Sequence, residues 1–88
     1  MAKQISIKEA LQSNGTFYRD VWQGVNTIKH EKYVWDKKAG LYEQFIRLLG
    51  TERWHSLGYP TARNMTQVEW LEQVFANTQT TLEVDDDE

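Results

Sequence analysis

Cysteine is absent from the sequence, which excludes disulfide bonds, thiolate metal sites and a cysteine nucleophile. A chain of 88 residues without cross-links depends on packing, because a domain of this size buries only about 60 to 65% of the surface that its unfolded form exposes. The lack of cysteine also fits a reducing compartment. We therefore expect a cytoplasmic protein.

Long apolar runs are missing as well. No stretch approaches the roughly 20 apolar residues that span a bilayer, and the N-terminus lacks the apolar segment of a secretory signal. With one proline and no low-complexity stretch, the chain also lacks an interdomain linker. The sequence predicts no membrane contact, a single compact domain over residues 1–82 and an acidic C-terminal tail over residues 83–88.

Catalytic motifs are equally scarce. His30 and His55 are the only imidazoles, and neither stands in a metal-ligand spacing. Phosphate-binding loops, dinucleotide-binding glycine patterns and nucleophile elbows do not occur. The sequence therefore predicts a protein that is not an enzyme, with no catalytic residues, no metal site and no cofactor.

Helix-capping signals are the clearest local feature of the chain. Ser6 and Glu9 have the spacing of a capping box, and Asn14 with Gly15 ends the short helix that they begin. Thr66 and Glu69 form a second box, which begins a helix that runs to about Asn77. Four apolar residues form the buried stripe of that helix: Val68, Leu71, Val74 and Phe75.

The segment after Thr16 favours a further helix over a strand. Its β-branched residues and Gly24 argue for the strand, but its apolar residues recur at spacings of four, four and three, which is helical. These residues are Phe17, Val21, Val25 and Ile28.

The middle of the chain has two interpretations. A helix over 31–49, or over 41–49 alone, would align Leu41, Phe45 and Leu48, and Thr51 would begin one more turn. Alternatively, residues 32–35 are extended and 36–40 form a turn. We predict an all-α fold, a small bundle of about four helices with an irregular or extended acidic C-terminal arm. The alternative is an α+β fold with a short hairpin around 31–45.

Charge is distributed unevenly along the chain. Residues 1–64 hold all ten lysines and arginines and six acids, whereas residues 65–88 hold seven acids and no base. Acids in the first turns of a helix favour its dipole, and an acidic terminus aids solubility, so this asymmetry has a purely structural explanation. The functional interpretation is that the acids bind a basic surface on a partner. The candidate residues are Glu69, Glu72, Asp85, Asp86 and Asp87.

Aromatic residues are more numerous than one small core needs, since the chain has eleven of them. Phe17, Phe45, Phe75 and Trp22 lie on predicted apolar stripes and are expected in the core. Three others lie near predicted loops and are candidates for an interface, because tryptophan and tyrosine anchor protein contacts. They are Trp35, Trp54 and Tyr59.

Together these patterns predict a non-enzymatic protein-interaction module that regulates or inhibits a macromolecular partner, most simply another protein with a basic surface. A sharper form is nucleic-acid mimicry by clustered carboxylates, as in some small phage-encoded inhibitors, with which this chain shares only size and acidity. The alternative is a helix-turn-helix nucleic-acid-binding protein, which the acidic pI of about 5.3 disfavours. Its phosphate-binding bases would be Lys29, Lys32, Lys37, Lys38, Arg47, Arg53 and Arg63.

Overall fold

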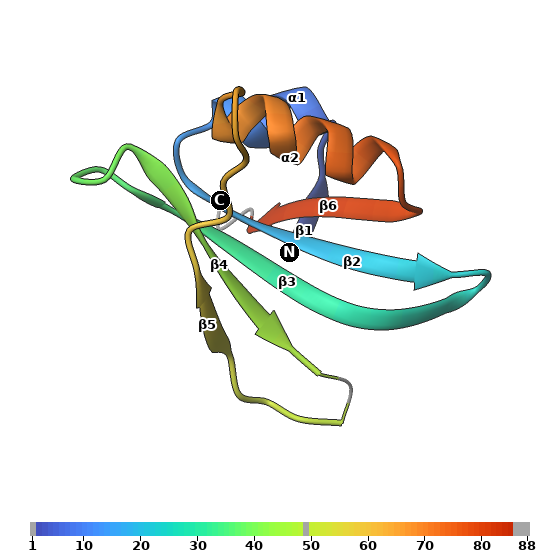
Figure 1. The fold of residues 1–88 in the computed structure, drawn as a ribbon. Coiled ribbons are helices and arrows are strands. Elements are labelled where there is room, and N and C mark those ends of the chain that lie inside the picture. The colour runs from blue at the N-terminus through green and yellow to red at the C-terminus, as the bar shows by residue number, and fades with distance from the viewer. Residues whose placement is uncertain (1, 49, 86–88) are drawn as a thin grey trace.

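The computed structural model describes residues 2–48 and 50–85 as a six-stranded antiparallel sheet with two short helices on one face (Figure 1). The strands lie in the order β1-β6-β2-β3-β4-β5. The elements are β1 (Ala2–Gln4), α1 (Ile7–Gln12), β2 (Thr16–Gln23), β3 (Asn26–Asp36), β4 (Leu41–Arg47), β5 (His55–Gly58), α2 (Gln67–Ala76) and β6 (Thr80–Asp85). The predicted all-α bundle is therefore wrong, and the α+β alternative is closer.

The segment after Thr16, predicted as a helix, is the hairpin of β2 and β3. Burial alternates along β2, so that Phe17, Arg19 and Val21 point toward the helices and the residues between them point away. One of the three inward positions is a charged arginine. That residue breaks the apolar alternation that would have marked a strand.

Gly24 and Val25 form the two-residue loop of this hairpin. Gln23 pairs with Asn26, and Gly24 has a φ of +64°, as a tight hairpin turn of the II′ type requires at its first loop position. The helix-turn-helix alternative needed helices around Gly15 and Gly24, and the structure places β2 and the start of β3 there.

Replacing Gly24 by alanine distinguishes the hairpin from the helix expected from the sequence. In a helix the change would be stabilising, but at a positive φ it should lower the free energy of unfolding by about 1 to 2 kcal/mol. Urea denaturation followed by circular dichroism measures the change. Gly15→Ala is the control, because Gly15 has no positive φ and an added Cβ would meet only ordinary contacts. A stabilised Gly24→Ala variant would contradict the turn.

The middle of the chain is also extended. The helix predicted over 41–49 is instead β4, which pairs with β3 from Asp36 opposite Leu41 to His30 opposite Arg47. This pairing is the hairpin of the α+β alternative, with residues 37–40 as its turn. The turn expected after Thr51 is not helical, and the chain continues through a loop into β5.

Both predicted helix starts are confirmed, but only the first capping box is complete. The Ser6 hydroxyl accepts a hydrogen bond from the backbone N–H of Glu9, whose side chain reaches back to the Ser6 backbone N–H, which completes the box at α1. At α2 the Thr66 hydroxyl accepts from the backbone N–H of Glu69, but the Glu69 carboxylate accepts from that same hydroxyl, so the second box is half formed. The second helix ends at Ala76 with Asn77 as its cap, as predicted.

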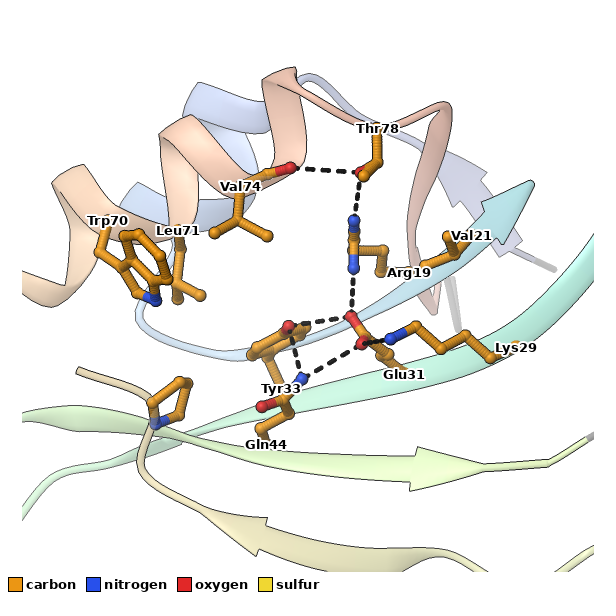
Figure 2. A pocket seen from close by; sticks show the side chains of 11 residues that line it. Arg19, Val21, Lys29, Glu31, Tyr33, Gln44, Trp70, Leu71, Val74 and Thr78 are labelled. Atoms are coloured by element: carbon orange, nitrogen blue, oxygen red, sulfur yellow. Dashed lines mark hydrogen bonds and ion pairs between the residues drawn. The ribbon is translucent and has the colours of Figure 1, made fainter. Parts of the chain in front are cut away.

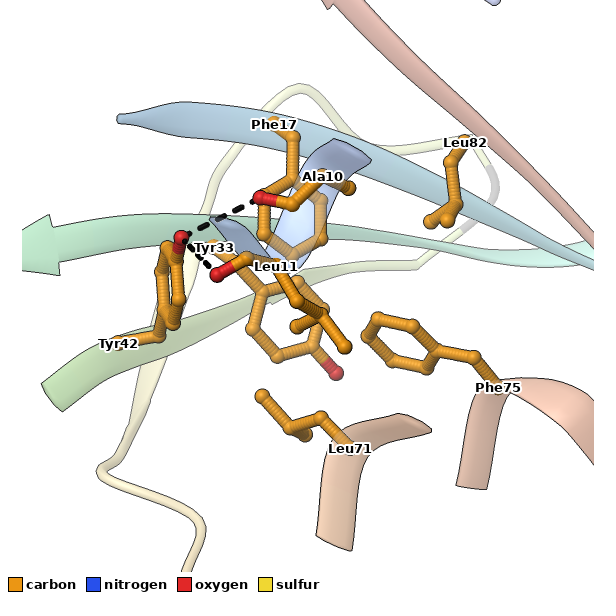
Figure 3. Packing of buried hydrophobic residues seen from close by; sticks show 8 residues of the cluster. All are labelled: Ala10, Leu11, Phe17, Tyr33, Tyr42, Leu71, Phe75 and Leu82. Atoms are coloured by element: carbon orange, nitrogen blue, oxygen red, sulfur yellow. Dashed lines mark hydrogen bonds between the residues drawn. The ribbon is translucent and has the colours of Figure 1, made fainter. Parts of the chain in front are cut away.

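The core lies between the two helices and the sheet (Figure 3). The Phe17 ring stacks on Tyr33 with 5.0 Å between ring centroids, and Phe75 meets the Tyr33 ring edge-on. The Tyr42 hydroxyl lies 3.1 Å from the carbonyl oxygen of Leu11 and fixes the end of α1 to β4. The buried core cluster consists of Ala10, Leu11, Phe17, Tyr33, Tyr42, Leu71, Phe75 and Leu82. The expectation of core burial thus holds for Phe17 and Phe75, while Phe45 and Trp22 are only partly buried.

The segment predicted as an irregular or extended arm is strand β6, which lies inside the sheet between β1 and β2. Leu82 faces the core from β6. Of the predicted tail over residues 83–88, the first three residues belong to β6, and 86–88 lie outside the described residues.

The Gln67 side chain on α2 forms hydrogen bonds with the backbone of β4 just beyond the end of β5. Gln67 is buried, accepts a hydrogen bond from the Tyr42 backbone N–H at 2.7 Å and donates to the Tyr42 carbonyl at 2.9 Å. Its amide also donates to the carbonyl of Pro60 at 2.9 Å. The Gln67 amide therefore satisfies the same two groups of Tyr42 that a neighbouring strand would pair.

Replacing Gln67 by leucine should lower the free energy of unfolding by about 1 to 3 kcal/mol, because it leaves buried backbone groups of Tyr42 without partners. Urea denaturation measures the loss. Gln73→Leu, at an exposed position of the same helix, is the matched control. If both variants lose the same stability, the amide does not act as a strand substitute.

Candidate binding sites on the two faces of the sheet

A pocket of about 280 Å³ opens between α2 and strands β2 to β4 (Figure 2). Its apolar wall comes mainly from α2, with Trp70, Leu71 and Val74. The opposite side is polar and comes from the sheet. The sheet residues that line it include Arg19, Lys29, Glu31, Tyr33 and Gln44.

Arg19 is buried in this pocket and its side chain is held on three sides. One terminal nitrogen, Nη1, donates to Glu31 at 2.5 Å, and the other, Nη2, donates to the Thr78 hydroxyl at 2.5 Å. Nε donates to Thr80 at 3.2 Å, and the guanidinium lies 4.7 Å from the Phe75 ring centroid. The arginine thus joins β2 to the segment that connects α2 with β6.

The Glu31 carboxylate accepts the remaining contacts of this network. Besides Arg19, it accepts hydrogen bonds from the Tyr33 hydroxyl at 2.9 Å and the Gln44 amide at 3.1 Å. The ammonium of Lys29 forms an ion pair with the same carboxylate at 3.1 Å. Glu31 is 1% exposed, so its charge is compensated almost wholly by these side chains.

Burial and the neighbouring charges shift the pKa of Glu31 in opposite directions. Burial raises its pKa, but the attraction and hydrogen bond of Arg19, with Lys29 and Tyr33, outweigh burial and hold the pKa below the usual range. Burial and the neighbouring Glu31 carboxylate raise the pKa of Tyr33. The carboxylate is therefore ionised at neutral pH, and the Tyr33 phenol keeps its proton.

Glu31→Gln should destabilise the protein in a pH-dependent way. At pH 7 the change leaves Arg19 buried without its counter-charge, which costs about 3 to 5 kcal/mol. Because the folded pKa is depressed, the carboxylate stabilises the fold above its unfolded pKa of about 4.3, and this contribution is lost as the pH falls through the folded value. Urea denaturation from neutral to acidic pH should show the difference from the wild type shrinking.

The matched control for that experiment is Glu43→Gln. Glu43 also lies on the sheet, but it accepts a hydrogen bond from Ser56 instead of pairing with a buried arginine. A Glu31→Gln difference that stayed constant between neutral and acidic pH would show that the ionised carboxylate is not the stabilising group.

The face of the sheet opposite the helices carries a second cluster. Trp54 comes from the loop before β5, and its ring centroid lies 6.1 Å from that of Tyr18 on β2. The Lys32 ammonium is 5.0 Å from the Phe45 ring centroid and 5.1 Å from that of Trp54. The Arg47 guanidinium is 5.2 Å from the Trp54 ring. We call these five half-buried residues, which come from four segments of the chain, the aromatic-cation cluster.

Acids flank this cluster on the same face. The pairing of β2, β3, β4 and β6, with alternation along each strand, puts four carboxylates, two cationic side chains and one histidine on this face. The cations are Lys32 and Arg47, and they lie in the cluster. The four acids are Asp20, Asp36, Glu43 and Glu83. The histidine is His30, whose Nδ1 lies 2.5 Å from the Asp20 carboxylate. With His30 neutral, the local balance is acidic, two positive charges against four negative ones.

The aromatic residues predicted for an interface lie at three different places. Trp54 is in the cluster on the helix-free face. Trp35 lies on β3, where its ring meets Tyr42 edge-on against the core. Tyr59 is 40% exposed and donates a hydrogen bond to Asp36 at 2.5 Å, which raises the pKa of Tyr59 to about 12 and lowers that of Asp36.

The two predicted acids on α2 do not gather with those aromatics. Glu69 and Glu72 are exposed on α2, on the opposite side of the sheet from Trp54. Asp85 ends strand β6 opposite Ala2. Asp86 and Asp87 lie outside the described residues.

The sequence pointed to part of the cluster and to little of the pocket. Trp54 is an interface candidate, and Lys29, Lys32 and Arg47 are phosphate-binding candidates of the alternative function. Tyr18 and Phe45 gave no interface signal, because neither was near a predicted loop. Arg19 and Glu31 looked like ordinary surface charges. A strand interpretation of 16–36 would have placed Arg19, Glu31 and Tyr33 on one face, since β2 and β3 pair Arg19 with Glu31.

Within residues 2–48 and 50–85, no group of three or more histidine, aspartate or glutamate side chains is placed to hold a metal ion. Neither described helix is long and apolar enough to cross a membrane. No known protein family matches the sequence, and no curated protein or solved structure shows significant similarity to it.

Proposed function

We propose that this chain is a non-enzymatic protein-binding module that regulates or inhibits its partner, and that the helix-free face of the sheet is its docking surface. The aromatic-cation cluster is the observation that carries the proposal. Half-buried aromatics and an arginine at the centre, with acids around them, are the composition of protein interfaces, in which a few such anchors supply most of the affinity. The absence of cysteine supports a cytoplasmic location.

The charge of this face supports a partner with basic groups. Tyrosine, phenylalanine and tryptophan on an open sheet would also suit stacking against the bases of single-stranded nucleic acid. However, the face holds four acids, and its basic side chains are already engaged: Lys32 and Arg47 lie over aromatic rings, and His30 contacts Asp20. Phosphate binding needs an excess of bases, so the same arrangement favours a protein with lysine or arginine at its rim.

Trp54→Ala should remove binding to the partner. Wild-type protein and variants would be immobilised and exposed to an extract of the source cells, and retained proteins would be identified by mass spectrometry. Loss of an aromatic anchor that is buried in the complex costs about 2 kcal/mol or more, so Trp54→Ala should bind a partner of the wild type at least about 30-fold more weakly and retain less of it. Retention should also weaken as salt is added.

Trp70→Ala is the matched control, because it removes the same side chain from the other side of the sheet. A partner retained equally by Trp54→Ala and the wild type would place the docking surface elsewhere. A Glu69→Ala, Glu72→Ala double variant tests α2 as that other surface. In parallel, labelled single-stranded DNA is titrated at low salt, and tight binding that Trp54→Ala abolishes would overturn the choice of a protein partner.

A further inference from the structure

The pocket beneath α2 has a free hydrogen-bonding capacity that its internal network does not use. Glu31 is enclosed by four donors, and Arg19 is held by Glu31, Thr78 and Thr80. Lys29 differs, because its side chain is 37% exposed and one ion pair leaves its ammonium with further N–H groups. Donors, not acceptors, are thus available at the mouth of the pocket.

Trp70 lines the pocket at the end away from Lys29. Figure 2 shows Tyr33 and Glu31 between the indole ring and the Lys29 ammonium. The indole therefore belongs to the wall of the pocket, and Lys29 is the group that an anionic oxygen would meet at the other end.

The local charge agrees with these donors. Two cations, Arg19 and Lys29, line the pocket with one anion, Glu31, which leaves a single positive charge. A cationic occupant would meet Lys29 and would find the Glu31 carboxylate already saturated. An anion gains attraction to Lys29 in a partly enclosed site, where charges are screened less than on the open surface.

The volume and the apolar walls of the pocket indicate the size and the hydrocarbon part of a ligand. The volume of about 280 Å³ equals that of about nine water molecules, so the pocket admits a ligand of about ten non-hydrogen atoms. Five residues give it apolar walls: Val21, Pro60, Trp70, Leu71 and Val74. These walls suit a hydrocarbon body next to the charged end.

We infer that this pocket binds a small amphipathic monocarboxylate, with the carboxylate on the Lys29 ammonium and the hydrocarbon body against the apolar side chains of α2. The site lies on the opposite side of the sheet from the proposed docking surface. It does not depend on that proposal, and each is tested by different variants.

Octanoate is a suitable probe because it has ten non-hydrogen atoms. Titrated at millimolar concentration into isotope-labelled protein, it should produce a saturable shift of the Trp70 indole N–H signal in the two-dimensional NMR spectrum, while the Trp54 signal stays in place. Octanol, which keeps the hydrocarbon body without the charge, and acetate, which keeps the charge without the body, should each bind at least about tenfold more weakly.

Lys29→Met should weaken octanoate about tenfold or more, because it removes the charge and keeps the length of the side chain. Lys32→Met, which removes a lysine from the other face of the same strand, should leave the affinity unchanged. The dispersion of the amide signals confirms that each variant is folded.

Four results would overturn the inference. Octanoate that causes no saturable shift shows that the pocket is not a carboxylate site. Octanol that binds as tightly as octanoate, or a Lys29→Met variant with wild-type affinity, shows an apolar cavity without charge recognition. Equal losses in Lys29→Met and Lys32→Met would indicate general attraction of the anion to the protein, without a defined site.

Discussion

The ion pair between Arg19 and Glu31 is the constraint on which the other contacts depend. A charge buried without a partner costs several kcal/mol, so each of these residues requires the other and requires the hydrogen bonds that complete it. Those bonds reach β4 through Gln44, the connection after α2 through Thr78, and β6 through Thr80. The pair therefore joins four strands and the end of the second helix into one arrangement, in which a shift of any of these elements breaks a bond to a buried charge.

The same pair explains how much of the fold could be predicted. Local signals were sufficient where a side chain bonds to its own backbone neighbourhood, so both helices follow their capping residues, Ser6 and Thr66. Strands β2 and β3 were missed because Arg19 and Glu31 occupy inward positions, where apolar residues would have shown a period of two. The insertion of β6 beside β1 depends on pairing across almost the whole chain, and no local pattern encodes such a contact.

The candidate sites were still less predictable, because each is assembled from segments that are distant in sequence. Trp54 was singled out for its position near a loop, and the structure places it among Tyr18, Lys32 and Arg47, which come from three strands. Trp35 had the same sequence signal and lies against the core instead. Proximity to a loop therefore selected one cluster residue, and only the strand register determines which side chains surround it.

The place of β6 has a consequence for the order of events during synthesis. This strand is the last to be translated among the described elements, yet it lies between β1 and β2 and contributes Leu82 to the core. Strand β1, near the start of the chain, pairs with β6, so it has no strand partner until the last strand has been synthesised. A nascent chain that lacks these residues can pair β2 to β5 but leaves β1 without a partner and exposes the edge of β2, and exposed edges are the sites at which unfinished chains pair wrongly. We therefore expect the protein to fold after translation has passed residue 85, as one late cooperative step.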